Sequence, residues 1–200
     1  MQMLIILLLS ILIIASVQGQ EVDDRDLPYH EMPPAPATFG PGNVVARMID
    51  GLGYRFYWAT EGLHPQDLLY RPTPEARSLS ETIDHILSLS QRMINAAEGV
   101  PNTSASHGTE EVTWQKRRAQ VLNTLRKTSQ RLADKEEDEL AALRIVFRTE
   151  KGETELPYWN MINGPIADAI YHTGQIASFR RITGNPMNPK VDVLRGKNRP

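Results

Sequence analysis

The region near the C-terminus places a carboxylate and an imidazole on one face of a predicted helix. Asp168 and His172 are four residues apart, so their side chains lie one above the other in a helix, and Gln175 falls on the same face. We expect Asp168 to be buried, because the rest of this stripe is apolar, and an unpaired buried carboxylate is costly unless it becomes neutral. The apolar members of the stripe are Met161, Pro165, Ile176 and Phe179.

Two arrangements would satisfy the carboxylate of Asp168. A divalent metal ion shared with His172 would neutralise it, and a direct hydrogen bond to His172 without any metal would also partner it. The four-residue spacing taken alone favours the hydrogen-bonded pair, because two residues at this spacing are a weak signal for a metal site.

His85 is a third candidate for the same site. It lies on the flank of the apolar stripe of another predicted helix, where a surface histidine is one interpretation. Flank positions also face the seam between neighbouring helices, and helix bundles build metal sites from such positions. The sequence therefore offers His85, Asp168 and His172 as candidate metal ligands.

Four amphipathic helices are predicted to position these residues, over residues 42–63, 79–98, 109–134 and 157–182. Apolar residues recur at helical spacing in each of them, and the connecting segments are modest in length. This pattern predicts an all-α domain, an antiparallel four-helix bundle, with one small β-hairpin before the last helix that pairs residues 145–147 with 154–156.

Local signals mark the ends of two of these helices. Ser78 and Glu81 form a capping box that starts the second helix. Pro165 is expected to kink the last helix, since proline has no N–H to donate. Arg180 and Arg181 suit the negative C-terminal end of that helix.

The N-terminal residues differ from the rest of the chain. Leu4 to Ala15 is almost wholly apolar, and small residues follow up to Gly19. The apolar run is shorter than the roughly 20 residues that span a bilayer, which favours a secretory signal cleaved after Gly19 over a retained anchor. We predict a signal peptide at residues 1–19, a flexible proline-rich spacer at 20–40, the bundle at 41–186 and a C-terminal tail at 187–200, in an exported protein (periplasmic or extracellular) with no membrane association after cleavage.

Composition excludes several classes of function. The formal net charge is −2 and the chain contains no cysteine. Disulfides and thiolate metal ligands are therefore excluded, and nucleic-acid binding has no electrostatic support.

Two sequence motifs resemble the DinB/YfiT-like superfamily. They are Glu81-Thr82-Ile83-Asp84-His85-Ile86, preceded by Pro72, and Tyr171-His172-Thr173-Gly174-Gln175-Ile176. The resemblance covers about residues 42–186 and implies a four-helix bundle with one metal bound by three residues. Carried over, those ligands are His85, Asp168 and His172. The commoner pattern has histidine in place of Asp168, and a carboxylate resembles the mycothiol-dependent isomerase branch.

The resemblance implies a divalent metal cofactor (Zn, Ni, Mn or Fe) at an open site. A metal-dependent enzyme, hydrolase-like or thiol-transferase-like, acting on an unknown small-molecule substrate, is the first hypothesis. An exported protein meets few reduced thiols, which weakens the thiol-transfer hypothesis. A non-catalytic metal- or ligand-binding or interaction module, possible as a homodimer, is the alternative. The residues do not identify a catalytic base.

Overall fold

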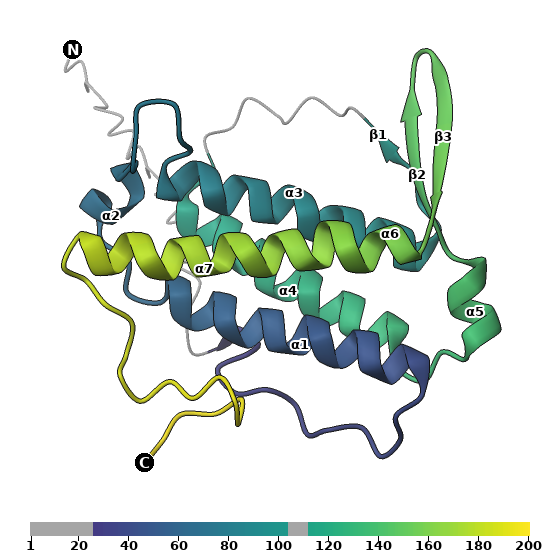
Figure 1. The fold of residues 1–200 in the computed structure, drawn as a ribbon, viewed down its shortest axis with the longest axis horizontal. Helices are drawn as coiled ribbons and strands as arrows, with labels where there is room; N and C mark the ends of the chain where they lie inside the picture. The colour runs from purple at the N-terminus through teal and green to yellow at the C-terminus, as the bar shows by residue number, and fades with distance from the viewer. Residues whose placement is uncertain (1–25, 104–111) are drawn as a thin grey trace, which may run out of the picture.

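The computed structural model describes residues 26–103 and 112–200, and four long helices dominate them (Figure 1). They are α1 (Pro41–Thr60), α3 (Leu79–Glu98), α4 (Trp114–Leu132) and α7 (Ala167–Ile182). Helices α1 and α3 each pack against both α4 and α7. The predicted signal peptide, residues 1–19, lies outside the described residues. No helix in the described ranges is both long enough and apolar enough to cross a membrane.

The core lies between these helices and follows the predicted apolar stripes. Its fully buried side chains share the inward faces of all four helices, and they include Ile49, Leu52, Phe56, Ile83, Ile86, Met93, Val121, Leu122, Leu125 and Ile176. The helical periodicity therefore predicted both the helices and the faces they bury, which is the expected result for amphipathic segments.

Shorter elements connect the long helices. They are α2 (Pro65–Leu69), α5 (Glu137–Ala142), α6 (Trp159–Met161), the π-helical turn η2 (Ile162–Ile166), and the strands β1 (Asn102–Thr103), β2 (Arg144–Thr149) and β3 (Gly152–Pro157). Strands β2 and β3 form the predicted antiparallel hairpin, whereas the parallel pairing of β1 with β2 was not predicted. The domain is therefore mostly helical with a small three-stranded sheet rather than all-α.

The π-helical turn before α7 is the predicted distortion at Pro165. Gly164 has non-helical backbone angles, φ −98° and ψ −106°, directly before the proline. The missing N–H of Pro165 removes a helical hydrogen bond, which explains why regular α-helix resumes only at Ala167. Asp168 therefore lies in the first turn of α7.

The prediction of a flexible spacer is wrong for residues 27–32. Leu27 and Tyr29 are buried, and the Tyr29 hydroxyl donates to Asp50 Oδ1 at 2.9 Å. The amide of Met32 donates to the carbonyl of Gly196 at 2.8 Å, so the C-terminal segment packs beside residues 27–32. The physical reason lies in α1, which is apolar on two faces and needs a second covering layer. The packed domain therefore extends beyond residues 41–186 at both ends.

Gly42 allows the first turn of α1 to approach the end of α4. A β-carbon at this position would lie 2.3 Å from the carbonyl oxygen of Leu132 and 2.6 Å from that of Lys135. The obstacle is backbone, which cannot rotate away, so we expect Gly42→Ala to lower the free energy of unfolding by about 1–3 kcal/mol. Urea denaturation checks this. Gly174→Ala is the matched control, since a β-carbon there meets no atom within 4 Å, and an equal loss in both variants would contradict the explanation.

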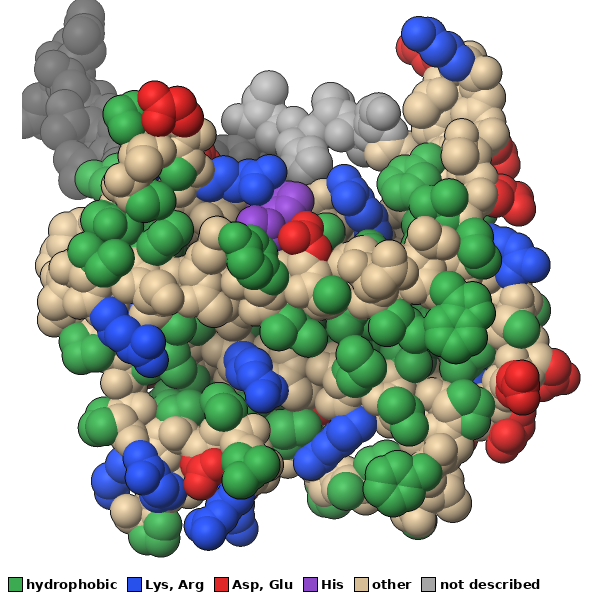
Figure 2. Space-filling view, in the orientation of Figure 1, with side chains coloured by type: hydrophobic (Ala, Val, Ile, Leu, Met, Phe, Trp, Pro, Cys, Tyr) green, Lys and Arg blue, Asp and Glu red, His purple; other side chains and the backbone are tan. Residues whose placement is uncertain are grey.

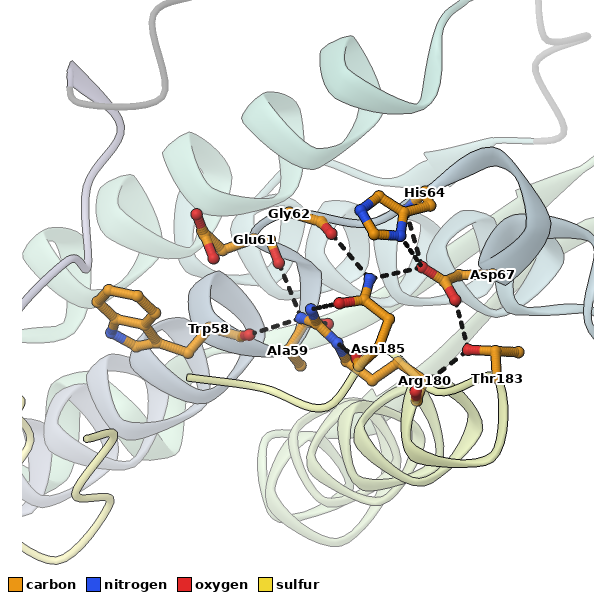
Figure 3. Close-up of polar contacts among 9 residues, drawn as sticks. All are labelled: Trp58, Ala59, Glu61, Gly62, His64, Asp67, Arg180, Thr183 and Asn185. Atoms are coloured by element: carbon orange, nitrogen blue, oxygen red, sulfur yellow. Dashed lines mark hydrogen bonds and ion pairs between the residues drawn. The ribbon is translucent and has the colours of Figure 1, made fainter. Parts of the chain in front are cut away.

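A buried polar network joins α1, α2 and α7 at one end of the domain (Figure 3). Arg180 donates to the carbonyls of Trp58, Ala59 and Glu61 at 3.2, 3.2 and 2.8 Å. Arg180 lies in the last turn of α7, as predicted, and its side chain also crosses to the end of α1, which was not predicted. The fully buried Asp67 accepts from the side chains of Thr183 and Asn185.

Protonation of Asp67 at low pH is expected to lower the stability of the fold. Burial alone would raise its pKa, but hydrogen bonds from Thr183, Asn185 and the His64 amide outweigh burial and hold the pKa below the ordinary 3.8. A depressed pKa contributes stability that is present above pH 3.8 and is lost as pH falls through the lowered value. We expect Asp67→Asn to flatten the fall of the melting temperature between about pH 5 and pH 2, measured by circular dichroism. A wild-type slope retained in this variant would assign the acid sensitivity to other carboxylates.

Candidate metal centre

His85 reaches the site from the second turn of α3, whose start is fixed by the predicted capping box. The amide of Glu81 donates to Ser78 Oγ at 3.1 Å, and the amide of Ser78 donates to Glu81 Oε2 at 2.9 Å. Arg71 holds the same carboxylate through two bonds, at 2.7 and 2.6 Å. The Glu81 side chain therefore caps the start of α3.

The structure brings all three predicted ligands together where α3 meets α7. Asp168 Oδ2 lies 3.1 Å from His85 Nε2, and Asp168 Oδ1 lies 3.3 Å from His172 Nε2. One ligand atom from each residue lies within 4.8 Å of the other two. The carboxylate thus bridges two imidazoles whose rings are 4.7 Å apart, centroid to centroid.

Gln175 fixes the orientation of the His172 ring. Its Oε1 lies 2.7 Å from His172 Nδ1, while its Nε2 donates to the hydroxyl of Tyr171 at 3.2 Å. Because the amide oxygen can only accept, Nδ1 carries the proton, and the lone pair of Nε2 faces Asp168 in the neutral ring. This is the arrangement by which outer partners orient histidine ligands.

Asp168 is more exposed than the apolar stripe predicted. Its side chain is 42% exposed, against 22% for His85 and 9% for His172. The carboxylate is therefore partly exposed to solvent, and the prediction that Asp168 is fully buried is wrong. The same exposure makes the site accessible. Figure 2 shows histidine and acidic side chains together on the surface.

Electrostatics keep His85 in the form that a metal ligand requires. Burial is the largest cause that lowers its pKa, and the charge of Arg77 acts in the same direction, while Asp168 opposes them. The net pKa lies below the ordinary 6.5. His85 is therefore neutral at neutral pH, with a ring nitrogen able to bind a cation.

Other residues noted in the sequence lie elsewhere. His64 precedes α2, where its amide donates to Asp67 Oδ2 at 2.8 Å, and so belongs to the polar network and not to the end of α1. Gln175, by contrast, belongs to the site, and its three-residue spacing from His172 was the available signal.

Gln175 gives a prediction for the metal site. Replacing it with methionine keeps the volume and removes the acceptor for His172 Nδ1, so the ring loses its fixed tautomer. We expect Zn²⁺ affinity to fall about 10–100-fold, the usual effect of losing such a partner. Competition with a chromogenic chelator measures the affinity, and Gln130→Met on the exposed face of α4 is the control. An unchanged affinity in Gln175→Met would remove this residue from the site.

Comparison with known proteins adds a structural relative. No family model and no curated protein matches the sequence. The structure is similar to the crystal structure of YjoA, a DinB-like protein from Bacillus subtilis, with a TM-score of 0.52 and 17% identity. The match covers 76% of this chain and 99% of that one. The chain therefore has the fold of a DinB-like protein, as its motifs led us to expect.

Proposed function

We propose that His85, Asp168 and His172 bind one divalent metal ion. The observation that carries the proposal is the orientation of His172, whose Nε2 faces a carboxylate oxygen at 3.3 Å and, in the neutral ring with the proton on Nδ1, presents a lone pair to it. Two lone pairs at this distance repel each other, so the arrangement needs either a cation held by both atoms or a second proton on the ring. A divalent ion satisfies His85 at the same time, because its Nε2 faces the other carboxylate oxygen.

The donor set indicates the class of metal. Two imidazole nitrogens and one carboxylate suit Zn²⁺, Ni²⁺, Mn²⁺ or Fe²⁺. Three protein ligands leave coordination positions open, which is typical of catalytic rather than structural sites. When bound, such an ion supplies Lewis acidity that can activate water, polarise a substrate oxygen or accept a thiolate.

We infer from this that the protein is a metal-dependent enzyme that acts on a small molecule. The partly exposed carboxylate supports access from solvent, and the DinB-like fold supports membership of that superfamily and an antiparallel bundle. Since we also propose that the protein is exported, a hydrolase-like reaction with water is favoured over transfer to a scarce thiol. The alternative is a non-catalytic binding module, and a closed coordination sphere or the absence of metal would favour it.

Cobalt substitution tests whether the site is open. Co²⁺ bound by the three residues gives a visible spectrum that depends on its coordination. We expect azide, and separately 2-mercaptoethanol, to change that spectrum saturably, because each occupies a position that the protein leaves free. A spectrum that neither reagent alters would mean a closed structural site and would overturn the enzymatic proposal. The His172→Ala variant supplies the baseline for non-specific cobalt.

A further inference from the structure

A groove lies along α3, and its lining begins at Leu87, two residues after the candidate ligand His85. It has a volume of about 740 Å³ and is lined by the second half of α3, by β1 and β2, and by part of α4. Ser88 and Arg92 line it, three and seven residues after His85. Residues at these spacings share one face of a helix, so the groove follows the face that carries the metal ligand.

The described lining of this groove contains cations and no carboxylate. Arg92 and Arg148 are its charged members, and amide and hydroxyl side chains such as Gln120 and Ser88 make up most of the rest. Arg148 pairs with Glu153 across the hairpin. Arg92 makes no ion pair within the described residues, so the described part of the lining keeps a net positive charge.

The guanidinium of Arg92 is held in place without being neutralised. It lies over the ring of Phe147 on β2, with Cζ 5.9 Å from the ring centroid, and the residue is half-buried. This cation–π contact restrains the group, and no hydrogen bond to the described residues uses its N–H groups. A restrained guanidinium with free donors suits bidentate recognition of a carboxylate or phosphate.

The distance from Arg92 to the metal ligand fits a single small molecule. Seven residues of continuous helix separate it from His85, a rise of about 10 Å. A molecule with an acidic group at one end could therefore contact Arg92 while its other end reaches the three metal ligands. Figure 2 shows basic side chains near the histidine and acidic side chains on this face.

We propose that this groove binds the anionic end of the substrate, a carboxylate or phosphate group held by Arg92. The link to a substrate rests on the proposed metal-dependent function, whereas anion binding in the groove does not require the metal. The polar amides along the lining would contact the middle of the same molecule. The substrate class is thus a small, polar, acidic compound.

Nuclear magnetic resonance titration of the ¹⁵N-labelled protein tests the groove directly. Succinate and inorganic phosphate are the anionic probes, and succinamide is the neutral match for succinate. We expect succinate or phosphate to shift amide signals of α3 and β2 saturably, and succinamide to leave them unchanged. The anion that binds more tightly identifies the acidic group that the groove prefers. In Arg92→Gln the dissociation constant should rise about tenfold, the usual cost of losing a charged hydrogen bond.

Two further variants make the result decisive. Arg181→Gln removes one positive charge from an exposed position on α7 and should leave binding unchanged. His172→Ala should still bind the anion, which separates failure of the groove from failure of the metal site. Equal binding in Arg92→Gln and wild-type protein, equal shifts with succinamide, or no saturable shift with either anion would overturn the proposal.

Discussion

The His172→Ala variant is expected to lose at least about a hundredfold in affinity for Zn²⁺, since loss of a ligand should exceed the 10–100-fold effect of losing an outer partner. Without this imidazole only His85 and Asp168 remain, and two ligands hold a cation less tightly than three. The variant should stay folded, because apolar side chains from all four long helices make up the core and remain unchanged. Chelator competition measures the affinity, and circular dichroism checks the fold.

A second histidine provides the matched control for this experiment. His64→Ala removes an imidazole that is 57% exposed and lies in the α1–α2 connection. Its Zn²⁺ affinity should equal that of the wild-type protein. If both variants bind Zn²⁺ as the wild type does, the ion resides elsewhere, and Asp168 with His172 is a hydrogen-bonded polar pair.

The second large effect is expected on stability. Arg180→Met should lower the free energy of unfolding by about 3–5 kcal/mol, because several backbone carbonyls lose their donor in a buried place. Burial of Arg180 lowers its pKa, and the charges of Asp67 and Glu61 oppose this, so the cation depends on its surroundings to remain stable there. Urea denaturation followed by circular dichroism measures the loss.

The adjacent arginine separates this effect from a general change in charge. Arg181→Met alters the exposed neighbour on the same turn of α7. It should change stability by no more than about 0.5 kcal/mol, as surface substitutions usually do. Similar losses in the two variants would show that the last turn of α7, and not the bonds from Arg180 to α1, accounts for the destabilisation.

Local pattern was enough to predict the positions of the candidate ligands. Four-residue spacing on a helix places Asp168 beside His172 by geometry alone, and the capping box at Ser78 fixes the turn on which His85 stands. The flank position of His85 did not identify which helix packs against it. The structure shows that α7 occupies that seam, which is a property of how helices pack and not of either helix by itself.

Features that depend on distant parts of the chain could not be predicted in this way. Tyr29 packs directly against Gly53, where an added β-carbon would lie 2.4 Å from the tyrosine ring. Arg180 is buried because carbonyls more than a hundred residues earlier accept its N–H groups. Periodicity describes one helix at a time, so it gives no information on such long-range partners.

The exposure of Asp168 shows a further limit of the periodic pattern. Its stripe is apolar over several turns, which predicted burial, but Asp168 follows the distortion around Pro165 and its side chain is 42% exposed. Helical periodicity describes which residues share a face, and it does not show where along that face the covering elements end.

Metal content is the most direct test of the central claim. The protein lacking residues 1–19, purified without an affinity tag, would be refed with Zn²⁺, Ni²⁺ and Mn²⁺ in turn, desalted and measured by plasma mass spectrometry. We predict close to one equivalent of at least one of these metals in the wild-type protein and almost none in His172→Ala. Absence of metal from the wild-type protein after all three treatments would contradict the account and leave His85, Asp168 and His172 as a hydrogen-bonded cluster.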